Sequence, residues 1–482
     1  MRKSILKNYV YNLAYQIITL LTPFITTPYL SRTLGPEGIG IYSYTTSIVS
    51  YFIILASMGV SDYAQREIAY HQGNRYLQSR TFFEVIGIRN LLVFISFFCY
   101  YLFLTQVESN HTIYWIQSIN ILAVLFDITW FFQGLEEFGK IVFRNLIVRI
   151  INIGAIFIFI HTPSDLNKYV FLLAVMNILS GLSIWVYLPQ YIVRVQWSDI
   201  YFFRNFFIII QMFLPQIAIQ VYTVLDKTMI GVITDLPAEN GYYEQAEKFV
   251  KMMLMIVTSL GTVMVPRIAS LYAHRQMDDI KRYIMRSYQF VWLMGLPMMF
   301  GLIGVIDTFV PWFFGPGYDK VGILVKIFTG LLLAIGINNV TGVQYLIPVN
   351  KQNTFTLTVI IGAAVNFFLN LLLIPSLMSV GAAIASVTAE SVIAIVQFYF
   401  VKKYFSLLDV LLLSKPYLLA STTMFLSITG VKYLARMEAS ILSSFILIVI
   451  GIVVYSGLMF VLRDEFFMET FNKLIRKVRS KI

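Results

Sequence analysis

Long apolar stretches, each of about 20 residues, alternate with short polar segments along almost the whole chain. A helix of that length is long enough to cross the hydrocarbon core of a bilayer. Fourteen such stretches can be distinguished. They lie near residues 9–30, 41–60, 82–104, 113–133, 142–162, 168–190, 206–233, 246–271, 288–310, 322–346, 354–375, 382–403, 411–434 and 440–462. The pattern predicts an all-α polytopic membrane protein with 14 transmembrane helices.

The basic residues are distributed unevenly over the segments between these stretches. If the N-terminus is cytoplasmic, most of the 36 lysines and arginines fall in segments on the cytoplasmic side. An excess of Lys and Arg on that side is the usual pattern in multi-pass membrane proteins. Adding or removing one span would invert every later loop, so the consistent bias supports fourteen spans with both termini cytoplasmic. Arg89 and Lys227 remain inside predicted spans.

The composition excludes several other classes of protein. A chain with 58% hydrophobic and 13% charged residues is not an ordinary soluble globular protein. The net charge of +11 is explained by inner loops that face anionic lipid. With Cys99 as the single cysteine, an internal disulfide is impossible. The connecting segments are short, and they carry no phosphate-binding glycine loop, metal-spaced histidine pair or Ser/His/Asp set. We therefore do not expect an enzyme.

An internal repeat relates the two halves of the chain. The matching positions are Gly40 and Gly241, Tyr42 and Tyr243, and Arg66 and Arg267, which lie 201 residues apart, and Gln133 and Gln344, and Lys140 and Lys351, which lie 211 apart. Both halves start on the same side of the membrane, which predicts two parallel, pseudo-symmetric six-helix lobes. The expected domains are an N-terminal lobe (1–200), a C-terminal lobe (201–405), an appended pair of spans (406–462) and a cytoplasmic amphipathic tail (463–482).

Several short motifs resemble those of Wzx-type polysaccharide flippases. They are residues 28–40 (PYLSRTLGPEGIG), 130–136 (WFFQGLE), 225–231 (LDKTMIG), 241–243 (GYY), 265–268 (VPRI) and 381–390 (GAAIASVTAE). The resemblance covers the first twelve spans. It implies a V-shaped fold with two lobes, shared with the lipid II flippase MurJ and with MATE exporters. It also implies an undecaprenyl-pyrophosphate-linked oligosaccharide as cargo, alternating access, a bacterial cytoplasmic membrane location and a glycan polymerase as partner.

Basic residues within or near the spans are candidates for binding the pyrophosphate. A charge inside a membrane is costly, and a guanidinium matches phosphate oxygens well. The candidates are Arg89, Arg149, Lys227, Arg66, Arg267 and Lys248. The structural alternative is that long basic side chains extend to the lipid headgroups, or simply anchor the cytoplasmic loops. Both interpretations remain open for this set.

Three acidic residues lie within predicted spans: Asp127, Asp226 and Glu390. A carboxylate inside the membrane can bind and release an ion, so these residues are candidates for coupling transport to H+ or Na+. Asp127 could instead pair with Arg89 or Arg149. The small residues before Glu390 permit close helix packing, which also allows it a structural role. No other cofactor is expected.

Two rival functions share the predicted architecture. One is a flippase for a teichoic acid or another carrier-lipid precursor, which would use the same cationic groups. The other is a MATE-like exporter of cations or drugs, for which Arg89, Arg149 and Lys227 are unfavourable and the three acids are favourable. A polymerase or ligase of lipid-linked glycans is disfavoured by the short connecting segments. The sequence leaves the identity of the glycan open.

Overall fold

The computed structural model describes the backbone of residues 5–204 and 206–479. Side chains are described over the same range, except in residues 5–21, in part of helix α8 (Phe206–Thr234) and in residues 473–479. The chain forms two compact units. Unit 1 comprises Met1–Gly231 and Leu236–Gly241, and unit 2 comprises Val232–Asp235 and Tyr242–Ile482.

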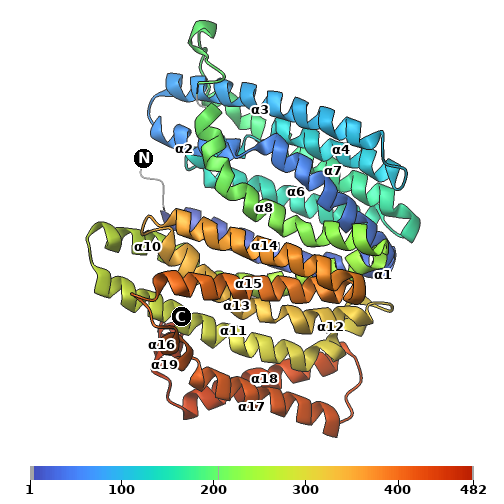
Figure 1. Ribbon diagram of the computed structural model, residues 1–482, viewed down its shortest axis with the longest axis vertical. Coiled ribbons are helices and arrows are strands. Elements are labelled where there is room, and N and C mark those ends of the chain that lie inside the picture. Colours follow the sequence, from blue (N-terminus) through green and yellow to red (C-terminus); the bar gives the residue numbers. More distant parts are fainter. Residues whose placement is uncertain (1–4, 205, 480–482) are drawn as a thin grey trace. The chain divides into compact units, whose positions relative to one another are not determined.

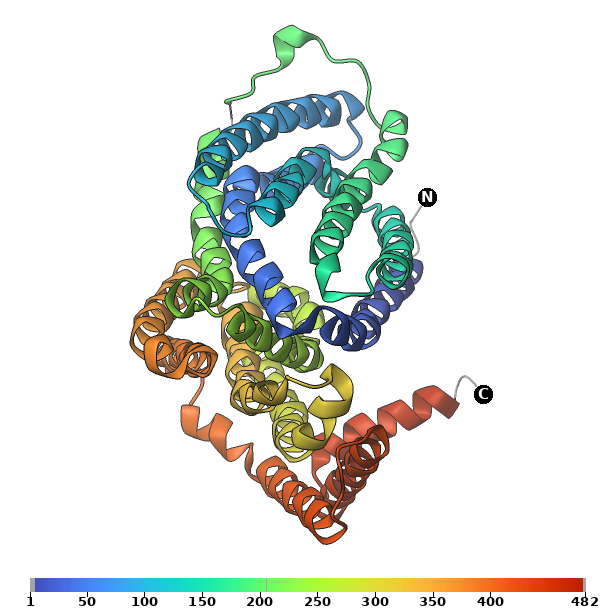
Figure 2. The ribbon, with the colours of Figure 1, turned by 90° about the vertical axis from the view of Figure 1, so that its right-hand side faces the viewer.

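Unit 1 is a bundle of helices (Figure 1). Clusters of buried apolar side chains form its interior. Its elements are α1 (Ile5–Ser57), α2 (Val60–Tyr70), α3 (Arg75–Leu104), α4 (His111–Ala123), η1 (Val124–Phe126), α5 (Thr129–Gly134), α6 (Phe138–Phe159), η2 (Pro163–Asp165), α7 (Leu166–Ser183), η3 (Ile184–Gln190), η4 (Trp197–Asp199) and most of α8. Figure 2 views these helices nearly end-on, arranged around a common centre. Part of the core is aromatic, with Phe82, Trp130, Phe131 and Phe132 packed together.

Unit 2 follows the same order of elements and adds a helix pair and a tail. Its elements are α9 (Pro237–Thr258), whose first residues up to Gly241 belong to unit 1, α10 (Gly261–Ala273), α11 (Met277–Phe314), α12 (Asp319–Phe328), α13 (Gly330–Asn338), the π-helix η5 (Asn339–Leu346), α14 (Gln352–Leu377), α15 (Ser379–Val401), α16 (Leu407–Leu412), α17 (Lys415–Leu434), α18 (Ile441–Val461) and α19 (Glu465–Arg479). Helices α14 and α15 lie side by side, and α17 and α18 both pack on α11 (Figure 1).

The long helix α1 is broken near its middle, where the sequence predicts the turn between the first two spans. Gly35 has φ 68° and ψ 174°, a conformation that a residue with a Cβ adopts only under strain. Pro36 follows directly and starts the next helical segment, as proline often does. A second break follows at Met58 and Gly59, both with positive φ. As a result, Arg66 lies on the separate helix α2 rather than in a loop.

The predicted fourth span, 113–133, is interrupted in the structure. Helix α4 ends at Ala123, a short 3-10 turn follows, and Asp127 adopts an extended conformation with φ −78° and ψ 98°. The Asp127 carboxylate accepts a hydrogen bond from the backbone N–H of Thr129 at 3.0 Å, as in an Asx turn. The break leaves nearby carbonyl groups without helical partners, so they can accept bonds from side chains.

Within the described residues, 12 helical segments are long and apolar enough to cross a membrane. The first, Thr22–Tyr70, covers the region in which the sequence predicts two spans. The predicted seventh span coincides with α8, some of whose side chains lie outside the described part of the chain. These findings establish an all-helical, multi-pass membrane protein, and the count of fourteen stays a prediction. In α19, Phe467 and Phe471 pack against Phe460, whereas the basic side chains at its end lie outside the described residues.

Candidate anion-binding cavity

Unit 1 contains a cavity of about 450 Å³ in the interior of its bundle. Helices α1, α3, α4, α5, α6 and α7 all contribute to its lining. The polar lining residues are Tyr42, Thr46, Ser57, Ser61, Arg89, Gln117, Asn120, Asp127, Thr129, Arg144, Asn177 and Ser180. A cavity with two arginines and many hydrogen-bonding groups, inside a membrane-spanning bundle, is suited to a polar or anionic ligand.

Arg89 is the most deeply buried charged residue on this cavity, with 1% of its surface exposed. Its guanidinium donates hydrogen bonds to the carbonyl oxygen of Asp127 and, at 3.3 Å, to that of Leu125. The guanidinium also lies 5.8 Å from the centre of the Trp130 ring. Its Nε has no partner among the described residues. Arg89 is therefore held in place by the helix break while part of its donor capacity remains unused.

The carboxylate of Asp127 lies on the same cavity but is not paired with Arg89. Arg89 contacts the backbone carbonyl of Asp127, and no carboxylate lies within ion-pair distance of Arg89 in the part of the chain that the structure describes. Asp127 itself is exposed to the cavity opening. The cavity is thus lined by a buried guanidinium, Arg89, and an exposed carboxylate, Asp127, that form no ion pair with each other.

Arg144, rather than Arg149, is the second arginine of the cavity. Its side chain is 9% exposed and donates to the carbonyl of Ser180 at 3.1 Å and to the hydroxyl of Thr129 at 3.3 Å. Two further bonds, of 3.0 and 2.7 Å, reach the amide oxygen of Asn145. Arg149 lies on α6 at intermediate burial and is not among the residues that line the cavity. Arg144 was not among the site residues predicted from the sequence.

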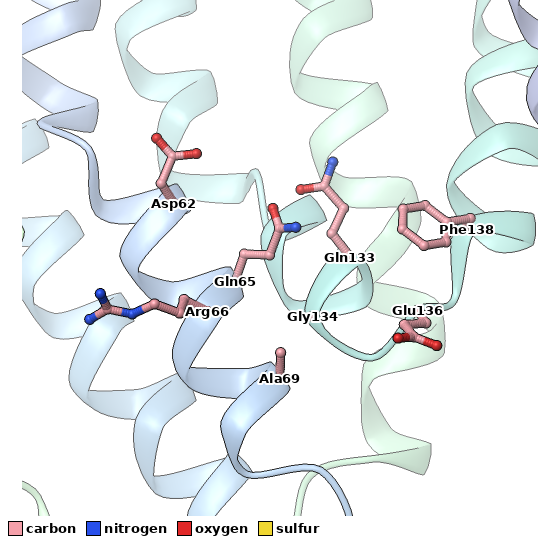
Figure 3. A pocket seen from close by; sticks show the side chains of 8 residues that line it. All are labelled: Asp62, Gln65, Arg66, Ala69, Gln133, Gly134, Glu136 and Phe138. Carbon is pink, nitrogen blue, oxygen red and sulfur yellow. The ribbon is translucent and has the colours of Figure 1, made fainter. Parts of the chain in front are cut away.

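Arg66 lines a second, separate pocket of about 420 Å³, between α2 and α5. Figure 3 shows Gln65 and Gln133 directed toward each other across this pocket, whereas Arg66 extends from the other side of α2. The guanidinium of Arg66 lies 3.3 Å from the carboxylate of Glu67 and near the rings of Tyr63 and Tyr70. Gly134 lets the two helices approach closely, because a Cβ there would lie 2.7 Å from the Gln65 carbonyl oxygen.

The other basic candidates do not converge on the cavity in unit 1. Arg267 is exposed on α10 and stacks on Tyr283, 5.3 Å from the ring centre. Lys227 on α8 is partly buried beside the buried Asp226. Lys248 is partly buried on α9. None of the three lines the cavity that contains Arg89.

Glu390 is held in unit 2 by an amide on the neighbouring element. The side-chain nitrogen of Asn338 donates to the Glu390 carboxylate at 2.6 Å and to the Glu390 carbonyl at 3.0 Å. Both residues belong to the interior of this unit, between α13 and α15. Of the predicted acids, Asp127 therefore lies on the arginine cavity, and Glu390 lies in a second, distinct polar contact.

The ninth predicted span contains a further acid, Asp307, which was not among the predicted site residues. Asp307 on α11 forms ion pairs with Lys326 of α12 at 2.7 Å and with Lys432 of α17 at 3.2 Å. These contacts tie the appended helix pair to the rest of unit 2. Because Asp307 is paired with two lysines, a structural role accounts for it. No group of three or more metal-ligating side chains occurs within the described residues.

A family model described as polysaccharide biosynthesis protein matches residues 5–272. This match covers more than half of the chain. The chain belongs to this family. The match and the relatives below confirm the resemblance to Wzx-type flippases that the sequence motifs indicated.

Two relatives illustrate the family membership. A protein assigned as an O-antigen transporter in Escherichia coli (strain K12) is 25% identical over 411 residues, which cover 83% of this chain and 97% of the relative. A protein assigned as the low-salt glycan biosynthesis flippase Agl15 of Haloferax volcanii is 20% identical over 391 residues, which cover 80% of each chain.

Solved structures with the same fold are transporters. The inward closed conformation of the lipid II flippase MurJ matches with a TM-score of 0.72 and 16% identity, covering 95% of this chain and 98% of that one. An inward-facing multidrug resistance transporter of the MATE family matches with a TM-score of 0.63 and 13% identity, over 84% and 99%. At these identities the likeness concerns the fold alone.

Proposed function

We propose that this protein is a flippase that moves an undecaprenyl-pyrophosphate-linked oligosaccharide from the cytoplasmic to the outer leaflet by alternating access. The proposal is supported by membership of the polysaccharide biosynthesis family and by relatives assigned as an O-antigen transporter and a glycan flippase. The MurJ-like fold is consistent with this role. A bacterial cytoplasmic membrane would supply both the carrier lipid and the cytoplasmic source of the glycan.

The proposal rests mainly on the burial of Arg89 and on the partners that its guanidinium has in the structure. A guanidinium that is 1% exposed and has no carboxylate partner in the described chain is costly to bury. Backbone carbonyls fix its position, and the unpartnered Nε leaves a donor for a ligand on the cavity. A diphosphate supplies the missing negative charge and several acceptor oxygens.

Flipping requires no bond chemistry from the protein. The obstacle is the head group, because a diphosphate and a glycan lose their hydrogen bonds to water when they enter hydrocarbon. The unit 1 cavity offers replacement partners: Arg89 and Arg144 for the diphosphate, and hydroxyl and amide groups for the sugars. The prenyl tail can stay in the lipid throughout. Movement between inward-open and outward-open states would then expose the cavity to each leaflet in turn.

The same cavity suggests a means of energy coupling. The Asp127 carboxylate is on the cavity and exposed, beside the backbone carbonyl to which Arg89 is bonded. We assign to Asp127 the binding of the coupling ion, H+ or Na+, in unit 1. Neutralising this carboxylate would increase the net positive charge of the cavity and favour the anionic cargo. Asp226 and Glu390 are the further candidates for coupling.

A transport assay with purified protein in liposomes tests the proposal. The substrate is a fluorescent undecaprenyl-pyrophosphate-linked glycan, and its arrival in the opposite leaflet is read by an impermeant quencher. Arg89→Ala should lower the rate about 10- to 100-fold, because two charge-assisted contacts are lost. Arg89→Lys should restore only part of the rate, since an ammonium lacks the planar fork. Wild-type rates in a folded Arg89→Ala protein would overturn the proposal.

A further inference from the structure

The polar groups of the cavity in unit 1 include two arginines, Arg89 and Arg144, and three side-chain amides, Gln117, Asn120 and Asn177. One helical turn along α7 from Ser180, whose carbonyl binds Arg144, lies Asn177. The amide-bearing part of the lining is thus adjacent to the arginine-bearing part, and the two parts offer different chemistry.

Gln117 on α4 is fully buried and only half satisfied. Its side-chain nitrogen donates to the hydroxyls of Thr45 at 2.7 Å and Thr46 at 3.3 Å. Its amide oxygen has no partner among the described residues, although the residue has 0% of its surface exposed. A buried acceptor without a donor is rare in folded proteins and costs free energy. The two threonines fix the orientation of the amide, and Gln117 is among the residues that line the cavity.

Asn177 and Asn120 extend this amide surface. The side-chain nitrogen of Asn177 donates to the side-chain oxygen of Asn120 at 2.8 Å, which joins α7 to α4. The bond leaves the Asn177 oxygen free as an acceptor and the Asn120 nitrogen free as a donor. Together with the Gln117 oxygen, the cavity presents two acceptors and a donor, all uncharged, on neighbouring turns of two helices.

We propose that Gln117, Asn120 and Asn177 form a subsite for the sugar that is attached directly to the diphosphate. The inference rests on the proposed function, because it takes the two arginines as the diphosphate site. In a glycan linked through a diphosphate, the first sugar is bonded to the distal phosphate, so its hydroxyl or acetamido groups lie next to the anion. Neutral amides match these groups, each of which both donates and accepts hydrogen bonds. The subsite would select among first sugars, whereas the arginines would bind any diphosphate.

An alternative is that the amides serve only to bond helices together, as polar residues do inside membranes. The Asn177–Asn120 bond fits that role by itself. Gln117 differs from other buried amides whose oxygen lacks a partner among the described residues, such as Asn338 and Gln397, in that it is among the residues that line the cavity. An unpartnered amide oxygen on a cavity-lining residue is the feature that indicates a ligand.

The test compares two probes on the full-length protein in nanodiscs. One probe is farnesyl diphosphate without a sugar, and the others are farnesyl-diphosphate-linked hexoses and N-acetylhexosamines. Gln117→Leu and Asn177→Leu should each weaken the best-bound sugar conjugate about tenfold, the equivalent of one lost hydrogen bond. The same variants should leave the affinity for farnesyl diphosphate unchanged. Thermal melting verifies that each variant is folded.

A matched control and the contrary outcomes keep the test decisive. Asn152→Leu on α6 removes a buried amide oxygen that also lacks a partner but does not line the cavity, so it should leave both affinities unchanged. If folded Gln117→Leu and Asn177→Leu bind every sugar conjugate as the wild type does, or lose both probes equally, the subsite is refuted. If the wild type fails to bind farnesyl diphosphate at all, the proposed function fails instead.

Discussion

The two units share one order of helices, but they use corresponding positions in different ways. Helix α2 begins at Val60 and α10 at Gly261, a shift of 201 residues that agrees with the repeat in the sequence. When α3 is aligned with α11 by a shift of 203 residues, buried positions of one helix coincide with buried positions of the other. These are 81, 84, 85, 88, 89, 92 and 93 in α3 and 284, 287, 288, 291, 292, 295 and 296 in α11.

In this register the arginines of unit 1 correspond to residues of a packed core. Arg89 corresponds to Trp292, whose ring nitrogen donates to the carbonyl of Val410 at 3.0 Å. Helices α6 and α14 begin 214 residues apart, which relates Arg144 to the fully buried Thr358. One unit therefore surrounds a cationic cavity, while the other uses the same positions for packing. The fold supplies the frame, and the side chains decide where a ligand can bind.

At two pairs of corresponding positions, one unit has a carboxylate where the other has an amide. Helices α7 and α15 begin 213 residues apart, which relates Asn177 to Glu390. The shift of 211 found in the sequence relates Asp127 to Asn338. In unit 2 the pair is closed by a bond of 2.6 Å, whereas in unit 1 the Asp127 carboxylate bonds the Thr129 N–H and lines the cavity. Asp127, whose carboxylate is not bonded to an amide side chain among the described residues, is therefore a better candidate for binding an ion than Glu390.

The largest expected effect concerns the close contact at Gly40 and Gly241, the corresponding glycines of the two repeats. Gly40 and Gly241 lie where α1 and the first turn of α9 cross: a Cβ on Gly40 would lie 1.7 Å from the Pro237 carbonyl oxygen, and one on Gly241 2.1 Å from that of Pro36. Either Gly→Ala substitution should destabilise the protein by about 4 kcal/mol or more, because backbone must move. The yield of monodisperse protein and its Tm measure this.

A control separates this effect from any general effect of replacing glycine with alanine. Gly154→Ala on α6 meets nothing within 4 Å and should leave the Tm nearly unchanged. If Gly40→Ala were as stable as Gly154→Ala, the close crossing would be wrong. If only one of the two crossing glycines were sensitive, the two repeats would not be equivalent at this contact.

The second prediction contrasts the two arginines of α6. Arg144→Gln should reduce liposome transport about tenfold, because the guanidinium on the cavity and its bond to the Ser180 carbonyl are both lost. Arg149→Gln should reduce it by no more than about twofold, less than one hydrogen bond is worth. The reverse ranking would show that the cavity of unit 1 is not the path of the cargo.

The third prediction compares the open and closed carboxylates. Asp127→Asn should retain binding of the lipid-linked glycan but lose acceleration by an imposed proton or sodium gradient, because the titratable charge on the cavity is gone. Glu390→Gln should mainly lower the Tm, by a few degrees, since it weakens the bond to Asn338. Gradient-driven transport lost only in Glu390→Gln would assign coupling to unit 2.

The smallest effect is expected from two labelling variants, which test the topology. In a protein lacking Cys99, single cysteines replace the exposed His274, predicted to be cytoplasmic, and the exposed Asn110, predicted to be outside. Neither variant should change transport. In intact cells an impermeant thiol reagent should label the cysteine at 110 and not the one at 274. Labelling in the opposite sense would invert the orientation of all spans.

Much of this architecture could be predicted from the chain, because hydrophobic length and charge bias report directly on the membrane. Arg89 could be predicted too, since an arginine in an apolar helix requires a reason. Arg144 could not, because it lies near the start of its helix, on the side predicted to be cytoplasmic, where a basic residue is ordinary. Helix α6 is apolar on almost all sides, so its sequence pattern does not separate Arg144 from Arg149. Only packing against Ser180 and Thr129 distinguishes the two.

The break around Asp127 left a signal that was misread. Residues 113–133 form one apolar run without glycine or proline before Gly134, so hydrophobicity alone predicts a continuous helix. An aspartate in such a run can, however, bond the backbone N–H two residues further on in an Asx turn, which competes with a continuous helix. The structure shows the consequence of the break, because the carbonyl of Asp127 accepts a hydrogen bond from Arg89.

The most direct test of the account is the binding of undecaprenyl diphosphate, without any glycan, to the purified protein in nanodiscs. Wild type and Trp292→Phe, the variant at the corresponding position of unit 2, should bind it with the same affinity. Arg89→Ala should bind it at least about tenfold more weakly, the cost of one lost charge-assisted hydrogen bond. If a folded Arg89→Ala protein binds undecaprenyl diphosphate as tightly as the wild type does, the cavity of unit 1 is not the diphosphate site and the account is wrong.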